Sequence, residues 1–298
     1  LNKKILITGG TGFIGFHLAK KLKKFKYNIT CLSHKKPKKE RLIKNVKYLV
    51  CDIKKYSDIK KKLKESYDYV FNFSGNVDHG NKSETFATHF GGCKNLVKFF
   101  KKKKINLFIQ IGSSLEYGSS NSPQKENQLC NPSSFYGKSK LKASKFLQKA
   151  YKKTKFPFIA LRLYQVYGPK QKFNRLIPHV VKSCFKNKNF KCTEGNQIRD
   201  FLYIDDLINL LAKIIKKKKI QSGIYNVGSG KPIQIKLIIN YITKKIKKGN
   251  PLFGRIKMRK EEITSLYPDI TKVKNKFNWK AKLSIFQGLQ KTIKSYKV

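Results

Sequence analysis

Tyr136 and Lys140 stand four residues apart in a stretch with a helical pattern, and this spacing can support acid–base chemistry. Residues four apart share one face of a helix, so the phenol and the amine are expected side by side. A nearby ammonium favours the phenolate and lowers the pKa of a tyrosine toward neutrality. Such a tyrosine can exchange a proton with a hydroxyl or a ketone while hydride moves at the neighbouring carbon. In a lysine-rich chain the pair alone also arises by chance, so its surroundings decide its meaning.

A serine precedes this pair at the end of a strand-like segment. Ser113 follows Gly112 and lies some twenty residues before Tyr136. Ligands of parallel α/β sheets bind beyond the carboxyl ends of the strands, where a serine hydroxyl can bond a reacting oxygen. Ser113, Tyr136 and Lys140 in this order are more specific than any one of them, and we predict them as the catalytic set.

The start of the chain predicts a cradle for a dinucleotide. An apolar strand-like segment runs into glycines 9, 12 and 15, and a helical pattern follows. Glycine permits the sharp turn and lets the backbone approach a ligand. The helix N-terminus adds free N–H groups and a positive dipole end, which together suit a pyrophosphate. The predicted cofactor contacts here are Gly9, Thr11, Gly12, Phe13, Ile14 and Gly15.

The elements that must position these residues alternate between strand and helix. The strand-like segments are 3–7, 28–32, 46–50, 68–73, 106–112 and 157–163, and the helical patterns lie near 12–25, 55–64, 83–103 and 133–154. This alternation predicts an α/β fold with a Rossmann-type doubly wound parallel sheet.

From residue 170 the pattern changes to a smaller C-terminal α/β cap. Helices are expected near 173–187, from Asp205, near 233–247 and near 283–296, with strands near 190–194 and 223–227. We expect an NAD(P)-binding domain over 1–169, to which later segments can return, and a mainly substrate-binding cap over 170–298, with the ligand cleft between them.

Over nearly its whole length the chain resembles the extended short-chain dehydrogenase/reductase superfamily, in particular its nucleotide-sugar epimerase, dehydratase and reductase group. The motifs that carry the resemblance are Thr8–Gly15, Cys51–Ile53, Tyr136-x-x-x-Lys140, Arg162–Pro169, Arg199–Asp206 and Tyr225–Gly230. It implies that Tyr136 is the acid/base, that Lys140 tunes it and binds the nicotinamide ribose, and that Ser113 orients the substrate.

The resemblance also implies binding residues away from the catalytic set. Asp52, with Ile53 beside it, matches the position that contacts the adenine. Arg199 matches an arginine on the substrate diphosphate, and a salt bridge to Asp200 or Asp205 is the alternative. Ser114, Asn174 and Arg175 are expected on the substrate side by position.

Two departures from the family pattern limit which reaction and which cofactor are expected. Dehydratases of this group carry an acidic pair after the Ser/Thr position, where this chain has Ser114 and Leu115, and Glu116 comes one place too late. Dehydration needs such a base and acid, so 4,6-dehydration is not expected. At the end of the second strand, Ser33, His34 and Lys35 stand where NAD-binding members usually have a carboxylate, which favours NADP(H) over the alternative NAD(H).

Two further positions leave their roles open. Asn72 and Ser74 end the fourth strand-like segment, where they either line the nicotinamide side or satisfy local backbone groups, and the second is favoured. His89 falls where many family members have an asparagine. With His79 it is a candidate extra proton carrier, although packing is the favoured interpretation.

The formal net charge of +52 raises the question of nucleic acid. Only six of the 68 basic residues are arginines, and the lysines are spread along the whole chain, which argues against a nucleic-acid reader. No apolar stretch approaches the roughly 20 residues of a membrane span. The six cysteines have no metal-like spacing, so we expect reduced thiols, no metal and a cytoplasmic protein.

Together these features predict a 4-ketoreductase that acts on a 4-keto-6-deoxy nucleotide-diphospho sugar. The near alternative is a nucleotide-sugar 4-epimerase with tightly bound NAD. The remote alternative is a non-catalytic anion- or RNA-binding protein on the same fold. Relatives lead us to expect a homodimer through the helices near 83–103 and 133–154.

Overall fold

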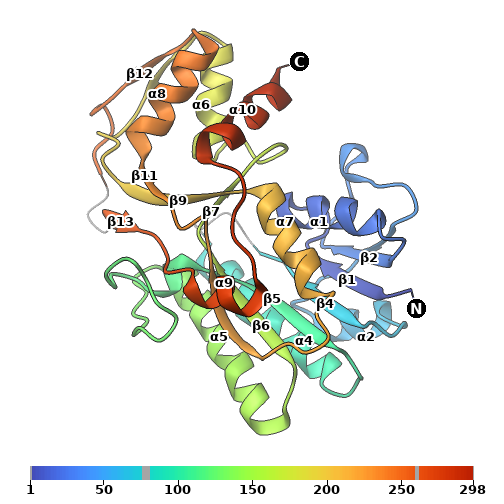
Figure 1. The fold of residues 1–298 in the computed structure, drawn as a ribbon. Coiled ribbons are helices and arrows are strands. Elements are labelled where there is room, and N and C mark those ends of the chain that lie inside the picture. The colour runs from blue at the N-terminus through green and yellow to red at the C-terminus, as the bar shows by residue number, and fades with distance from the viewer. Residues whose placement is uncertain (1, 76–80, 259–261, 298) are drawn as a thin grey trace. The chain divides into compact units, whose positions relative to one another are not determined.

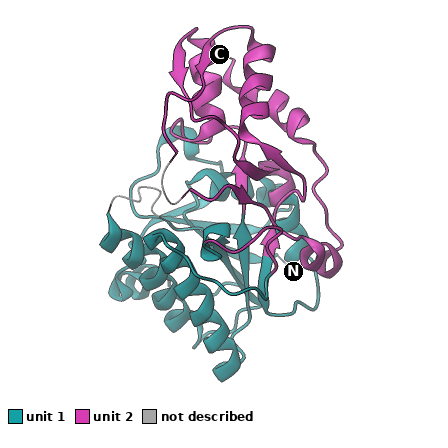
Figure 2. Ribbon diagram, turned by 90° about the vertical axis from the view of Figure 1, so that its left-hand side faces the viewer, with its two compact units in different colours: residues 1–118, 126–163, 208–225 teal, residues 119–125, 164–207, 226–298 magenta. Residues whose placement is uncertain are grey.

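The computed structural model describes residues 2–75, 81–258 and 262–297. By its internal contacts the chain divides into two compact units (Figure 2). Unit 1 comprises Leu1–Gly118, Glu126–Leu163 and Ile208–Tyr225, and unit 2 comprises Ser119–Lys125, Tyr164–Leu207 and Asn226–Val298. The chain therefore enters unit 2 once early, at 119–125, and returns to unit 1 with 208–225. Which unit binds cofactor and which binds substrate remains a prediction from the sequence.

Unit 1 is built on a seven-stranded sheet in the order β10-β6-β5-β4-β1-β2-β3 (Figure 1). The strands are β1 (Lys4–Thr8), β2 (Asn28–Ser33), β3 (Lys47–Val50), β4 (Tyr69–Asn72), β5 (Leu107–Ser113), β6 (Phe158–Leu163) and β10 (Gly223–Val227). All pairings from β6 to β3 are parallel. From β3 to β6 this is the strand order of dinucleotide-binding sheets, and it confirms the doubly wound α/β fold.

Helices cover both faces of this sheet, as right-handed crossovers between parallel strands require. They are α1 (Phe13–Lys23), α2 (Tyr56–Lys62), α3 (Lys82–Phe86), α4 (Gly92–Phe100), α5 (Phe135–Thr154) and α7 (Ile204–Ile214). Figure 1 shows α1 and the C-terminal part of α7 on one face and α2, α4 and α5 on the other. On the second face a continuous apolar core joins these helices to the strands, with Leu6, Val70 and Phe108 among its buried members.

A π-helical turn, η2 (Ala87–Gly91), joins α3 to α4 and carries His89. Such turns widen a helix by one residue and occur often at functional sites. Short 3-10 turns follow two strands: η1 (Lys39–Arg41) lies between β2 and β3, and η3 (Ser114–Glu116) directly follows β5.

Unit 2 has a four-stranded sheet around β9 and a two-stranded sheet, with helices from three parts of the chain. Its elements are β7 (Gln165–Tyr167), α6 (Leu176–Phe185), β8 (Asn189–Lys191), β9 (Ile198–Tyr203), β11 (Pro232–Gln234), α8 (Ile235–Ile246), β12 (Asn250–Leu252), β13 (Ser265–Leu266), α9 (Thr271–Phe277) and α10 (Ile285–Tyr296). β9 pairs antiparallel with β11 and parallel with β7 and β13, while β8 pairs with β12. The sequence indicated α6, α8 and α10 of this unit, but neither α9 nor β9, although the β9 motif was noted.

Three global features bear on function. The six cysteines are unpaired, and five of them are buried. Within the described ranges, no helix is long and apolar enough to cross a membrane. The same part of the chain holds no group of three His, Cys, Asp or Glu side chains that could bind a metal ion.

Candidate active site

The glycine turn after β1 forms a tight cradle that side chains would fill. Gly9 has φ +66°, and a Cβ there would lie 2.7 Å from the Phe73 carbonyl oxygen. A Cβ on Gly15 would lie 2.3 Å from the Gly9 carbonyl oxygen. Gly12 is the N-cap of α1, so the residue directly before the first N–H groups of the helix has no side chain. The turn therefore fits a pyrophosphate at a helix N-terminus, with Thr11 inside it and Phe13 and Ile14 in the first helical turn.

Ser113 is the last residue of β5, and it caps the short turn that follows. Its Oγ accepts from the Leu115 N–H at 3.2 Å, and its own N–H donates to Glu116 Oε1 at 2.9 Å. Ser113 and Ser114 are buried. This capping box fixes the Ser113 hydroxyl at the carboxyl end of the central sheet, where ligands of such sheets bind.

Glu116 is fully buried and paired with Arg162 of β6. The Arg162 Nε donates to Glu116 Oε2 at 2.9 Å, and the two side chains are 3% and 0% exposed. Because the second carboxylate oxygen holds the Ser113 N–H, both oxygens have structural partners. The carboxylate nearest to the two positions where dehydratases carry acids is thus part of the scaffold.

Tyr136 and Lys140 lie one turn apart on α5, whose N-terminus is capped by the Ser134 hydroxyl. The Lys140 Nζ is 5.7 Å from the centre of the Tyr136 ring and donates to the Ile111 carbonyl oxygen at 2.9 Å. Burial lowers the pKa of Lys140 to about 8, and the Glu116 carboxylate opposes this shift. The structure therefore brings the predicted phenol and amine together and ties the amine to β5, two residues before Ser113.

The His89 ring packs edge-on against Tyr136, with ring centres 5.1 Å apart and an interplanar angle of 88°. His89 is 2% exposed, and a Cβ on Gly75 would lie 2.6 Å from its Cε1. Packing is thus one role of His89. His79 lies outside the described residues.

The end of β2 presents basic side chains. Ser33 is buried and its hydroxyl donates to the Lys35 carbonyl oxygen at 2.7 Å, whereas His34 and Lys35 are exposed. Arg41, which our sequence analysis did not consider, places its guanidinium 5.4 Å from the centre of the Phe16 ring in α1. Its signal was its rarity, an arginine in a chain whose cations are almost all lysine.

Asp52 and Ile53 follow β3 and lie side by side with different exposure. Asp52 is partly exposed, accepts from the Lys54 N–H at 3.0 Å and lies 3.6 Å from the Lys54 Nζ. Ile53 is buried, and its Cδ1 would lie 2.4 Å from a Cβ on Gly92. Contact with an adenine remains a prediction for both.

In unit 2, Arg199 holds a neighbouring segment of the chain. Its guanidinium donates to the carbonyls of Ile198, Ile263 and Thr264 and pairs with Glu262 at 2.6 Å. Burial lowers the pKa of Arg199, and Glu262 counteracts the shift. The salt-bridge partner of Arg199 is thus Glu262, and not Asp200 or Asp205, which the sequence analysis considered as the alternative to the substrate diphosphate. Asp200 instead binds the N–H groups of Ser229 and Gly230.

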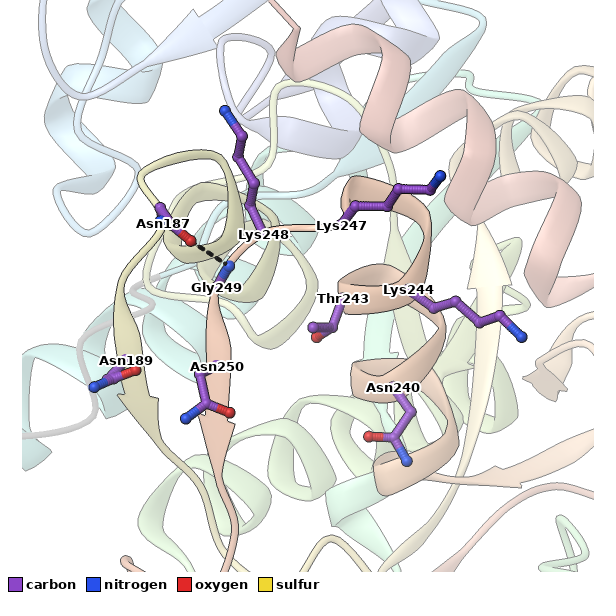
Figure 3. Close-up of a pocket in the computed structure, with 9 residues that line it drawn as sticks. All are labelled: Asn187, Asn189, Asn240, Thr243, Lys244, Lys247, Lys248, Gly249 and Asn250. Carbon is purple, nitrogen blue, oxygen red and sulfur yellow. Dashed lines mark hydrogen bonds between the residues drawn. The ribbon is translucent and has the colours of Figure 1, made fainter.

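The other predicted substrate residues in unit 2 are more accessible. Asn174 is exposed, and Arg175 is the half-buried N-cap of α6. Figure 3 shows a separate hollow in this unit, of about 730 Å³, between α8 and the β8–β12 pair. The side chains of Lys244, Lys247 and Lys248 extend away from the asparagines that line it. No predicted site residue lines this hollow.

Comparisons with known proteins agree with this architecture. The sequence profile of the NAD dependent epimerase/dehydratase family matches residues 5–228. CDP-abequose synthase of Salmonella muenchen is 29% identical over 300 residues, which span 98% of this chain and 98% of that protein. dTDP-D-glucose 4,6-dehydratase of Dictyostelium discoideum is 32% identical over 260 residues, 76% of this chain but only 58% of that protein. A solved structure, UDP-glucuronic acid 4-epimerase of Bacillus cereus with UDP-glucuronic acid and NAD, matches with a TM-score of 0.85, 25% identity and 98% of each chain covered.

Proposed function

This chain belongs to the NAD dependent epimerase/dehydratase family, and from that premise we propose that it is a 4-ketoreductase for a 4-keto-6-deoxy nucleotide-diphospho sugar. The observation that carries the proposal is the pairing of Tyr136 with a buried Lys140 beside β5, while Glu116, the carboxylate that follows positions 114 and 115, is paired with Arg162. Similarity to a relative named for a CDP-linked sugar, along both full lengths, supports the substrate class.

The residues after β1 fit a dinucleotide. Only glycine fits at position 9, because a Cβ there would clash with the Phe73 carbonyl, and its bare backbone lets a pyrophosphate approach closely. Gly9 to Gly15 would hold the pyrophosphate, and Lys140 would bind the nicotinamide ribose. When bound, the nicotinamide supplies the hydride that reduces the sugar ketone.

Tyr136 would donate the proton that the sugar oxygen needs as the ketone is reduced. The Lys140 ammonium, held against the Ile111 carbonyl, stabilises the phenolate that remains. The Ser113 hydroxyl, fixed by its capping box, would orient the same sugar oxygen. These three roles need no further acid or base, which is the difference between ketone reduction and dehydration.

Dehydration would require the acidic pair at positions 114 and 115. Ser114 and Leu115 supply no carboxylate, and Glu116 would leave Arg162 as an unpaired buried cation if it moved. This argues against the reaction of the dehydratase relative, despite its 32% identity.

We favour NADP(H) over NAD(H). His34 and Lys35 are exposed after β2, no acid stands in that run, and Arg41 lies beside the helix that follows the glycine turn. An arginine there suits the 2′-phosphate of NADP, whereas NAD-binding sheets place a carboxylate on the ribose. Under this proposal Ser33 shapes the turn and does not itself bind the phosphate, because its hydroxyl is bonded to Lys35.

The remaining assignments rest on position. Ser114, Asn174 and Arg175 are proposed on the substrate side, with Asp52 and Ile53 at the adenine, whereas the bonds of Arg199 favour a structural role over the predicted contact with the diphosphate. A homodimer through α4 and α5 and a reducing, cytoplasmic setting are proposed as well, the latter because six unpaired thiols persist best there.

The deciding experiment incubates the purified protein with a panel of nucleotide sugars, with and without NADPH. A reductase oxidises NADPH in proportion to product, with a mass gain of two hydrogens. Turnover without added cofactor and without a mass change would instead establish the 4-epimerase, which the similarity to the Bacillus cereus epimerase favours as the second candidate. Salt-sensitive RNA binding together with no cofactor uptake would replace both with a binding protein.

A further inference from the structure

A row of polar side chains crosses the centre of the unit 1 sheet, where apolar residues are expected. Thr8 of β1, Asn72 of β4 and Gln110 of β5 are register partners on adjacent strands. They are 0%, 1% and 1% exposed. Leu6, Val70 and Phe108, two residues earlier on the same strands, belong to the core under α2, α4 and α5. Since side chains alternate along a strand, the polar row lies on that same face, at its end nearest the glycine turn.

The row is fully hydrogen-bonded. Thr8 Oγ1 donates to Asn72 Oδ1 at 2.7 Å, Asn72 Nδ2 donates to Gln110 Oε1 at 2.8 Å, and Gln110 Nε2 donates to the Ile111 carbonyl oxygen at 3.1 Å. The same carbonyl accepts from the Lys140 Nζ at 2.9 Å. Three buried polar side chains cost free energy unless all are satisfied, and a satisfied set rigidifies its surroundings.

The two ends of the row fix the direction of every bond in it. The Ser74 N–H can only donate, and it reaches Thr8 Oγ1 at 3.3 Å, so the Thr8 hydroxyl is free to donate onward. The Ile111 carbonyl can only accept. Between these ends, Asn72 and Gln110 each have one amide orientation that satisfies both neighbours. The row therefore joins the strand that enters the cofactor turn to the carbonyl that anchors Lys140.

We propose that Gln110 is a positioning residue for Lys140, acting through the Ile111 carbonyl, and that Thr8 and Asn72 hold the Gln110 amide in the orientation this requires. The inference rests on the proposed acid–base roles of Tyr136 and Lys140. It assigns a function to Gln110, which our sequence analysis did not consider. The only signal there was one amide inside the otherwise apolar run Leu107–Ile111.

The first test is Gln110→Met, which keeps the length of the side chain and removes its donor. We expect kcat to fall about tenfold or more, because small misplacements of a catalytic group are costly, while KM for NADPH changes less than about threefold. Phe108→Leu is the matched control: it alters the same strand and the same face without touching the Ile111 carbonyl, and kcat should stay within about twofold.

Double variants separate positioning from general destabilisation. If Gln110 acts through Lys140, Gln110→Met should cause no further loss of kcat in a Lys140→Met background. An equal fold-loss in both backgrounds would overturn the proposal. Along the row, kcat should suffer most in Gln110→Met, less in Asn72→Leu and least in Thr8→Val, and the reverse order would overturn it as well.

An ultraviolet titration tests the same inference without turnover. The difference spectrum between the protein and its Tyr136→Phe variant reports the ionisation of Tyr136. In the Gln110→Met background its midpoint should rise by about 0.5 to 1 pH unit, because a displaced ammonium stabilises the phenolate less. An unmoved midpoint overturns the inference. Absence of turnover with every nucleotide sugar would reject the proposed function alone, and the titration would still decide the role of Gln110.

Discussion

Lys140 of the predicted catalytic set in unit 1 and Arg199, the predicted diphosphate residue of unit 2, are both buried cations, yet their polar groups have different partners. On α5, the Lys140 ammonium donates to the Ile111 carbonyl and lies over the ring of Tyr136, its proposed partner in catalysis. In β9, the Arg199 guanidinium is bonded to three carbonyls and a carboxylate of its own unit.

The difference teaches that a motif match fixes the residue but not the use of its side chain. Tyr136 and Lys140 share a helix, so their spacing alone brings them together. Arg199 meets Glu262 across 63 positions of sequence, which no local pattern encodes. Tyr136 and Lys140 remain our proposed acid–base pair, whereas the bonds of Arg199 hold a neighbouring segment of its own unit.

Removing the phenol should give the largest effect. Tyr136→Phe is expected to lower kcat by about a thousandfold, since it deletes the proton donor. NADPH oxidation with the identified substrate measures this. Tyr151→Phe, on the same helix but packed against Phe158, is the control and should keep its activity. Full activity in Tyr136→Phe would show that Tyr136 and Lys140 are not an acid–base pair, and the difference from Arg199 would then have no catalytic meaning.

Replacing Arg199 tests whether its side chain stabilises the fold. Arg199→Leu should lower the free energy of unfolding by about 3 kcal/mol, because it strands buried carbonyls and one carboxylate. Urea unfolding followed by circular dichroism measures the loss. Glu262→Gln keeps the carbonyl bonds and should cost less. An unchanged stability with a raised KM would make Arg199 a substrate residue, as the sequence predicted.

The buried lysine should carry a stability cost that depends on pH. Its pKa is lowered by burial from 10.5 to about 8, so the unfolded chain binds the proton more tightly between these values. The folded state therefore gains stability as pH rises from about 8 to 10.5, and the full cost, about 3 kcal/mol, applies below pH 8.

Lys140→Met removes this cost together with the ammonium. The variant should be no less stable than the parent at pH 7. It should also lack the gain in folding stability that the parent shows between pH 8 and 10.5. Thermal unfolding at several pH values measures both. Activity of the parent should decline as pH rises through about 8. A marked loss of stability at pH 7 in the variant would show that Lys140 is mainly structural, like Arg199.

Cofactor choice should give the smallest effect. Arg41→Ala is expected to weaken NADPH binding about tenfold and to leave NADH binding unchanged, because only NADPH carries the 2′-phosphate. Fluorescence titration with both cofactors measures the difference, and Lys39→Ala in the same turn is the control. Equal weakening of both would assign Arg41 to packing against Phe16.

Much of unit 1 was predictable because its signals are local. The expected strand over 28–32 became β2 (Asn28–Ser33), and the expected helix near 133–154 became α5 (Phe135–Thr154). β9 escaped prediction because Arg199 and Asp200 interrupt its apolar pattern, and both are buried only through partners far along the chain. Gln110 escaped prediction because its partner Asn72 lies on a neighbouring strand, 38 residues away in the sequence.

By itself the sequence determined the alternation of strand and helix, the glycine turn and the shared face of Tyr136 and Lys140, because each depends on residues within a few positions of one another. Only the tertiary structure decided that Glu116 is bound to Arg162, that Arg199 is bound to Glu262, and that a polar row runs from Thr8 to the anchor of Lys140. Those outcomes depend on strand order and burial, which bring distant side chains within hydrogen-bonding distance and exclude water from them.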